Sequence, residues 1–198
     1  QQKGISKMSD LKNNDYVDFI TTATIALTAT TPLTNGANGS VEDATYQTYL
    51  DKMEAYTFNA MGCPSTKSTL ADLFVSYCKR LRDEVGKKFQ VVTFRNLADY
   101  EGVVSVKNGV VGNTESPDLI PWATGVVAGT AVNKSATNMT YDGEYEVDTD
   151  YTQTELENGI LEGSFMFHLV DDEVRVLEDI NTFVSVTDEK SADFSSNQ

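Results

Sequence analysis

The sequence is poor in the residues that most often carry chemistry, because its 198 residues include only one histidine and two cysteines. Two thiols do not make a disulfide framework, and we expect Cys63 and Cys78 to be small buried side chains in a reducing compartment. A catalytic cysteine or a Ser–His–Asp triad would depend on His168, which lies in the alternating stretch FMFHLVDD. Ser164 is too close along the strand to be its nucleophile, and no Gly-x-Ser-x-Gly elbow is present. His168 is therefore interpreted as an ordinary strand residue, and we expect no enzymatic activity.

Motifs for cofactors and metals are also missing. The sequence contains no P-loop, no Gly-x-Gly-x-x-Gly after a strand, no His-Glu-x-x-His and no paired Cys-x-x-Cys. We expect no cofactor and no zinc site. The stretch Asp142–Asp150 resembles a calcium loop in composition, but it lacks the order of the ligands and the trailing glutamate. An exposed acidic loop is the favoured interpretation of this stretch, with a calcium site as the alternative.

Long apolar runs are absent too. None approaches the roughly 18 residues that a membrane-spanning helix needs, and no secretory signal opens the sequence. Both ends, QQKGISKMSD and SSNQ, look like the interior of a longer sequence. We therefore expect the chain to be a fragment of a longer protein.

Basic residues are scarce in one half of the chain. The net charge is −15, and from Tyr141 onward sixteen acidic residues face only Arg175 and Lys190. This sign disfavours binding to nucleic acid or to an anionic membrane. A solvated acidic face is the simpler interpretation, and an acidic surface that meets a basic partner is the alternative.

The order of apolar and turn residues predicts two domains. Residues 1–39 are interpreted as a small β-rich lobe with strands at Asp15–Ile20 and Ala23–Thr28, closed by the turn-rich stretch Thr31–Ser40. Residues 40–198 are predicted to form an α/β domain, with a mainly parallel sheet and flanking helices.

The first half of this α/β domain alternates between helix and strand signals. Ser40 starts a capping-box-like sequence before a helix, and a strand is predicted at Tyr56–Ala60, ending in Met61-Gly-Cys-Pro64. Ser65 or Thr66 is expected to cap a second helix, which Gly86 ends. The apolar run Phe89–Phe94 is typical of a strand buried on both faces.

The second half gives the remaining elements. Val103–Val106 is predicted as a strand, and Pro121–Val132 as a helix that packs closely through Gly125 and Gly129, with Trp122 as a core anchor. Further signals predict a helix capped by Thr152 or Thr154 and ending at Ile160 or Leu161, and a hairpin of Ser164–Val170 and Glu173–Leu177 around Asp171-Asp172.

Several segments, taken in order and spacing, carry a family resemblance. They are YQTYLDKMEAY at 46–56, FNAMGCP at 58–64, residues 79–94, DYEG at 99–102, LIPWATGVVAGTAVNKS at 119–135, YDGE at 141–144, residues 151–161 and VRVLEDINTF at 174–183. Together they resemble the contractile tail sheath proteins of Gram-positive bacteriophages, prophages and R-type bacteriocins. The resemblance implies a core domain that is subtilisin-like in architecture only, since the chain lacks the three protease motifs.

The resemblance also implies a function. Sheath subunits form hexameric rings stacked around the tail tube, and contraction drives the tube through the target cell envelope without a nucleotide. The implied partners are other sheath subunits, the tail tube protein and the baseplate, in a phage-tail-like particle assembled in the bacterial cytoplasm. Asp171, Asp172 and Glu173 are the candidate intersubunit acidic surface.

Family members carry terminal arms and a C-terminal domain, which this chain is expected to lack, so the fragment alone is expected to be monomeric. The rival hypotheses are an acidic adhesion or carbohydrate-binding module and a degenerate hydrolase.

Overall fold

The chain divides into two compact units, Gln1–Ser40 and Val41–Gln198. The computed structural model describes residues 11–13, 15–16, 18–19, 22, 43–131, 133–186 and 195. The predicted β-rich lobe and the helix cap at Ser40 lie almost wholly outside these residues. Of the strand predicted at Asp15–Ile20, the described Asp15 and Tyr16 lie in a turn.

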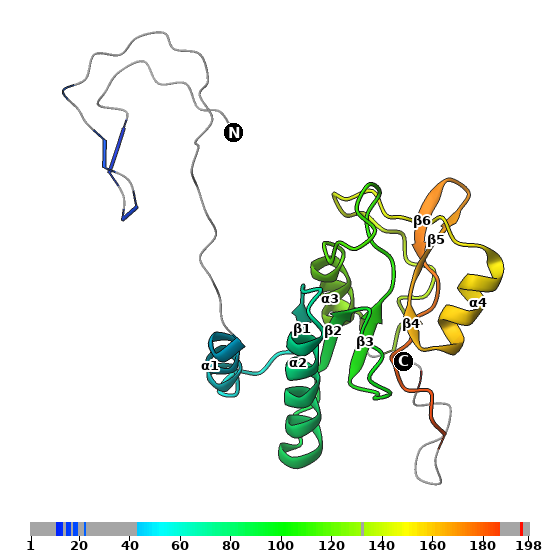
Figure 1. Cartoon of the computed structure of the whole chain (residues 1–198), viewed down its shortest axis with the longest axis horizontal. Coiled ribbons are helices and arrows are strands. Elements are labelled where there is room, and N and C mark those ends of the chain that lie inside the picture. Colours follow the sequence, from blue (N-terminus) through cyan, green and yellow to red (C-terminus); the bar gives the residue numbers. More distant parts are fainter. Residues whose placement is uncertain are drawn as a thin grey trace. The chain divides into compact units, whose positions relative to one another are not determined.

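The second unit is built on a four-stranded parallel sheet, as the sequence predicts (Figure 1). The strands are β1 (Ala60–Cys63), β2 (Gln90–Phe94), β3 (Val103–Val106) and β4 (Ser164–Phe165), in the order β1-β2-β3-β4. In this register Val92 lies between Gly62 and Val104. The four strands lie side by side in the same order as they occur in the sequence. The connections between them therefore all run in one direction across the sheet.

Successive residues of a strand point to opposite faces of the sheet, and in this sheet both faces are buried. Val91 and Val103 belong to a first core cluster with the helices α1 (Asp43–Met53) and α2 (Ser68–Arg80). Val92 and Val104 belong to a second core cluster with α3 (Ile120–Gly129), and all four valines have no exposed surface. The unit is therefore a helix–sheet–helix sandwich around two apolar layers.

The first strand and second helix begin later than predicted. Instead of a strand at Tyr56–Ala60, the chain turns after α1, and Tyr56 is 63% exposed. The strand begins at Ala60, because only that register buries Met61 and Cys63 beside β2. Likewise neither Ser65 nor Thr66 caps α2: the N-cap is Lys67, which makes no side-chain cap bond.

The end of this helical region agrees with the prediction. A π-helical turn, η2 (Leu81–Val85), extends α2, and Gly86 follows it with a left-handed φ of 80°. Glycine adopts this conformation without the steric cost that a Cβ atom brings, and it therefore ends the helix.

The glycines of α3 do not have the role that the sequence suggests. A Cβ atom on Gly125 or Gly129 would meet nothing within 4 Å, so the predicted close packing through these positions is wrong. The close approach occurs at Gly62 of β1 instead, where a Cβ would lie 2.5 Å from the Thr124 Oγ1 atom. The strand, and not the helix, supplies the glycine on which α3 packs.

The last helix, α4 (Gln153–Leu161), has the cap that the sequence predicts as one of two alternatives. Thr152 Oγ1 accepts a hydrogen bond from the Glu155 backbone N–H, and the Glu155 carboxylate accepts one from the Thr152 backbone N–H at 2.8 Å. Thr154 lies inside the helix. The reciprocal pair is a complete capping box.

Replacing Thr152 by alanine should lower the free energy of unfolding by about 1 kcal/mol, because the first turn of α4 loses its cap. Thr154→Ala is the matched control, since it removes the same atoms from an exposed helical position. Urea unfolding of both variants, followed by circular dichroism, checks this. Equal losses for the two variants would contradict a capping role for Thr152.

The predicted hairpin is present, but it is shorter than expected. The segment Ser164–Val170 divides at Met166: its first part is β4 of the parallel sheet, and its second part is β5 (Phe167–Val170). β5 pairs antiparallel with β6 (Glu173–Val176) in a separate two-stranded sheet. Asp171 and Asp172 form the two-residue turn, with φ angles of 49° and 65°. Positive φ at both positions is the geometry of the type I′ turn.

Candidate functional site

The candidate acidic surface lies at the turn of the β5–β6 hairpin. Asp171, Asp172 and Glu173 are consecutive and exposed, so the structure places the three carboxylates on one projecting turn. The Glu173 Oε2 atom accepts hydrogen bonds from Arg175 at 2.6 Å and from Thr140 Oγ1 at 3.4 Å. The surface is thus acidic and accessible, and Arg175 partly neutralises it from the base of the turn.

The neighbouring stretch Asp142–Asp150 contributes to packing. The Asp142 carboxylate accepts a hydrogen bond from the Trp122 Nε1 atom at 2.7 Å. The Trp122 ring lies 4.8 Å from Tyr141 and 5.5 Å from Phe167, between centroids. Trp122 therefore joins α3 to the acidic half of the chain, and it packs against the second core cluster as the sequence predicts. Across residues 43–131 and 133–186, no three acidic, histidine or cysteine side chains are grouped as ligands for a metal ion.

His168 stands where the strand interpretation places it. It lies on β5 opposite Arg175 of β6. Burial lowers the pKa of the imidazole, and the adjacent Arg175 guanidinium lowers it further. A catalytic triad needs a carboxylate that holds the imidazole and a nucleophile beside it. The cross-strand neighbour here is a cation, which is the opposite of that requirement.

The two cysteines are buried and reduced, as expected. Burial raises the pKa of Cys63 to about 11 and that of Cys78 to about 12. Both thiols therefore stay protonated at neutral pH, and a protonated thiol is a poor nucleophile. Cys78 Sγ instead lies 3.3 Å from the Gly102 carbonyl oxygen and donates a weak hydrogen bond to it.

At the carboxyl edge of the sheet, where open α/β sheets usually bind ligands, side chains bridge the loops that follow the strands. Arg95 follows β2 with a left-handed φ of 49°, and its guanidinium spans to the loop after β3. It donates to the Lys107 carbonyl at 2.9 Å, to the Thr114 carbonyl at 2.9 Å and to the Glu115 carboxylate. The arginine therefore serves to hold this loop across the sheet edge.

Asn108 is a buried residue at the same edge, and its side chain bonds two other segments of the chain. Its side chain is fully buried, and its Nδ2 atom donates to the carbonyls of Asp148 at 2.8 Å and Phe167 at 3.0 Å. Its Oδ1 atom accepts from the Phe167 N–H at 2.9 Å. One amide side chain thus pairs with both backbone groups of Phe167, as a neighbouring strand would. These contacts hold β5 beside the loop that follows β3.

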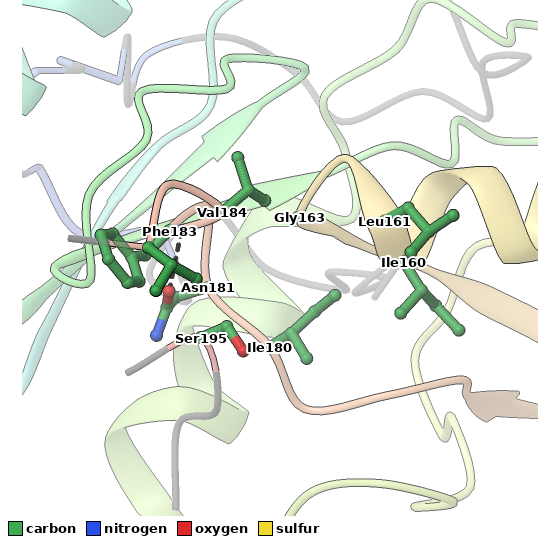
Figure 2. A pocket seen from close by; sticks show the side chains of 9 residues that line it. Ile160, Leu161, Gly163, Ile180, Asn181, Phe183, Val184 and Ser195 are labelled. Carbon is green, nitrogen blue, oxygen red and sulfur yellow. Dashed lines mark hydrogen bonds between the residues drawn. The ribbon is translucent and has the colours of Figure 1, made fainter. Parts of the chain in front are cut away.

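An apolar groove is a surface feature that sequence reasoning missed (Figure 2). It encloses about 250 Å³ between the end of α4 and the segment that follows β6. Leu161 is 75% exposed there, Val184 48% and Val186 66%. The available signal was Ile160-Leu161, two apolar residues at a helix end, followed by Phe183, Val184 and Val186 beyond the predicted hairpin. Exposed apolar patches of this kind often mark contacts with other chain segments or partners.

Known proteins resemble the chain over nearly its whole length. A family model described as the phage tail sheath protein central domain matches residues 39–182. Two Bacillus subtilis proteins match 98% of this chain: the phage-like element PBSX protein XkdK at 31% identity and the uncharacterized protein YqbK at 33% identity. The chain spans 47% of each of them, so it is about half as long as the curated relatives that it matches.

Two solved structures have the same fold. The sheath tail protein of Desulfitobacterium hafniense is 39% identical with a TM-score of 0.78, and the match covers 98% of this chain and 48% of that one. The sheath tail protein of Listeria innocua is 32% identical with a TM-score of 0.75, covering 96% of this chain and 46% of that one.

Proposed function

The chain belongs to the phage tail sheath protein family, whose central domain it contains, and we propose that it is the core of a structural subunit in a contractile tail sheath. Such a sheath surrounds a tail tube and contracts to drive it through the envelope of a target cell. The observation that carries the proposal is the family match over residues 39–182, supported by two sheath tail proteins with the same fold.

The partners are part of this proposal, because the chain spans only about half of its relatives. They are other sheath subunits in stacked hexameric rings, the tail tube protein and the baseplate. The proposed location is a phage or phage-tail-like particle, assembled in the bacterial cytoplasm. Antibodies raised against this chain should label such particles along the whole tail in electron micrographs. Labelling of the baseplate alone, or of no particle, would contradict the proposal.

The proposed role is mechanical and not enzymatic. The sheet is buried on both faces, and Arg95 and Asn108 tie the loops at its carboxyl edge. Close-packed interiors resist deformation, so such a block moves as a unit when its contacts change. We propose that subunits slide past one another as near-rigid bodies and that the energy is stored when the sheath assembles.

The acidic turn is proposed as a surface that exchanges ionic partners during contraction. Changing Asp171 and Asp172 to Asn and Glu173 to Gln, in a sheath protein that contains this chain, should make contraction less sensitive to salt. The reason is that salt screens the attraction between charges, and a neutral turn has no ionic contact for salt to weaken. Contraction would be scored by electron microscopy across a salt series.

A matched control removes three acidic residues elsewhere. Asp43, Asp51 and Glu84 are exposed and belong to the nearly neutral half of the chain. Their neutralisation changes the net charge equally and should leave the salt dependence as it is. An identical shift for both triple variants would mean that net charge alone, and not the turn, sets the response.

The 198-residue chain by itself is proposed to stay monomeric, since the rest of a sheath subunit is needed for assembly. Sedimentation velocity should therefore give one species near the mass of 21.7 kDa. Rings or tubes formed by this chain alone would overturn this part of the proposal.

A further inference from the structure

The segment Asn181–Ser185 returns to the loop that leads into β3, although the two lie more than eighty residues apart in sequence. We call this segment the strap. It is uncharged, and it forms one wall of the apolar groove, where Figure 2 shows Asn181, Phe183 and Val184. The side chains of Asp99 and Thr182 make polar contacts between the strap and the loop.

Asp99 holds the end of the strap. A single carboxylate oxygen, Oδ1, accepts from the Val184 N–H at 2.9 Å and from the Ser185 N–H at 3.0 Å. Asp99 has a left-handed φ of 47°, an uncommon and strained conformation for a residue with a side chain. A hydrogen bond from the Ser185 side chain lowers the pKa of Asp99 most, followed by those two backbone bonds. The charged group that faces it from a packed element is Lys79 of α2, which lowers the pKa further.

Thr182 holds the middle of the strap. Its hydroxyl group accepts from the Tyr100 N–H at 3.2 Å and donates to the Tyr100 carbonyl at 3.1 Å. Its own N–H donates to the Val103 carbonyl at 2.8 Å. One threonine thus satisfies three backbone groups at the entrance to β3. Because Thr182 is only 1% exposed, the Tyr100 N–H would lose its partner without gaining water if the hydroxyl were removed and the strap stayed closed.

The strap is buried apart from the core of the domain. Phe183 is 5% exposed and the preceding Ile180 is 8% exposed, yet neither belongs to either of the two core clusters. Beyond Phe183 the described chain is exposed, with Val184 at 48% and Val186 at 66%. Phe183 is therefore the one buried apolar side chain within the strap, and the two apolar layers of the sheet are built from other residues.

We propose that the strap is a detachable element, held closed by the side chains of Asp99 and Thr182, which opens as a unit while the four-stranded sheet and its helices stay folded. Segments with few buried apolar contacts open locally at a lower free energy than the core around them. Opening removes one wall of the groove and exposes Phe183 beside Leu161, which is already exposed.

The consequence for the particle rests on the proposed function. In a sheath subunit, the strap would be a joint, and polypeptide beyond it could change direction while the core domain remains rigid. The opening itself is a property of this chain alone, so it can be tested without any particle. A failure of the sheath proposal would leave the result of that test unchanged.

Native-state hydrogen exchange, followed by NMR, tests the opening. In Asp99→Gly, which removes the acceptor but relieves the left-handed backbone, the amides of Val184 and Ser185 should exchange at least tenfold faster. The amides of Val92 and Val104 in the sheet should keep their rates within about threefold. Asp99→Asn is the matched control, because its side-chain oxygen still accepts both bonds and asparagine tolerates this conformation.

Two further measurements keep the test decisive. In the wild-type chain, hydrogen exchange would be measured at increasing denaturant concentrations. The Thr182 and Val184 amides should begin to exchange at a lower concentration than the Val104 amide. Thr182→Val, which removes the hydroxyl group at nearly constant volume, should accelerate exchange along the strap. Faster exchange of the sheet amides in parallel with the strap would overturn the proposal, as would unchanged strap amides in Asp99→Gly.

The same contacts predict how the strap responds to pH. Since the folded pKa of Asp99 lies below its ordinary value of 3.8, the carboxylate stabilises the closed strap above that value. This contribution is lost as the pH falls through the folded pKa. The Val184 and Ser185 amide signals should therefore shift only below pH 3.8 in the wild type, and they should not shift in this way in Asp99→Asn.

Discussion

An Asn108→Asp variant should be less stable than the wild type by about 4 kcal/mol at neutral pH. The wild-type Nδ2 group donates to two carbonyl oxygens, those of Asp148 and Phe167. A carboxylate has no proton to donate, so its oxygen would face both carbonyls without water. Asn108 has no exposed surface, and no base is among its hydrogen-bond partners to compensate the charge.

The pH dependence identifies the cause. Burial would raise the folded pKa of the new carboxyl group above its unfolded value, so the protonated form is favoured in the folded state. The loss of stability should then be smaller at pH 4 than at pH 8, because the protonated acid can donate to one carbonyl. Urea unfolding followed by the fluorescence of Trp122 measures both values.

Asn113→Asp is the control for this substitution, since Asn113 is exposed and the change in net charge is the same. It should shift stability by less than about 0.5 kcal/mol. Equal effects at the two positions would mean that Asn108 does not hold β5 through its amide group.

Truncating Phe165 to alanine should cost about 4 kcal/mol, because it removes a fully buried ring from the second core cluster. Phe165 ends β4, where the parallel sheet meets the hairpin, and its ring packs edge-on against Phe167 at 5.6 Å between centroids. Phe167 in turn contacts Trp122. The cavity would therefore lie under both the sheet and the aromatic group that joins α3 to the hairpin.

Thermal unfolding and the emission of Trp122 together test this prediction. We expect a lower midpoint and a shifted tryptophan emission in Phe165→Ala. Tyr56→Ala, at a position that is 63% exposed, should change neither quantity appreciably. A loss below about 1 kcal/mol for Phe165→Ala would show that the site collapses around the missing ring and does not hold the two sheets together.

These two residues connect the parallel sheet to the hairpin. Asn108 joins the sheet edge to the hairpin through polar bonds, and Phe165 joins them through apolar contact. The acidic turn projects from the hairpin that both residues support. A force on that turn would therefore be carried into the sheet, which suits the role proposed for a sheath subunit.

The sequence predicted best where the signal was local. Val103–Val106 is an apolar run that no tertiary contact needed to place, and its bounds are confirmed. Thr152, with Glu155 three residues later, is a capping box within one helical turn. The Asp171-Asp172 turn between two alternating stretches is equally local, and it forms the hairpin that the pattern indicates.

Prediction from the sequence failed where a residue distant in the chain determines the local structure. The strand near Tyr56 was misplaced because pairing with β2, thirty residues later, decides its register. Gly125 and Gly129 look like contact points in the helix, yet α3 meets the sheet through Gly62. The stretch after Ser164 reads as one strand, but the side chain of Asn108 takes the backbone bonds of Phe167 and helps divide it.

The sequence by itself determined the α/β class, the membership of the sheath family and the concentration of negative charge after Tyr141, because composition, periodicity and motif order do not depend on which residues meet. Only the tertiary structure decided that Arg95 and Asn108 tie the loops at the sheet edge, that the strap fastens on Asp99 and Thr182, and that an apolar groove lies beside it. Each of these is a contact between residues far apart in sequence, and such contacts form only when the buried sheet fixes where the loops between its strands can lie.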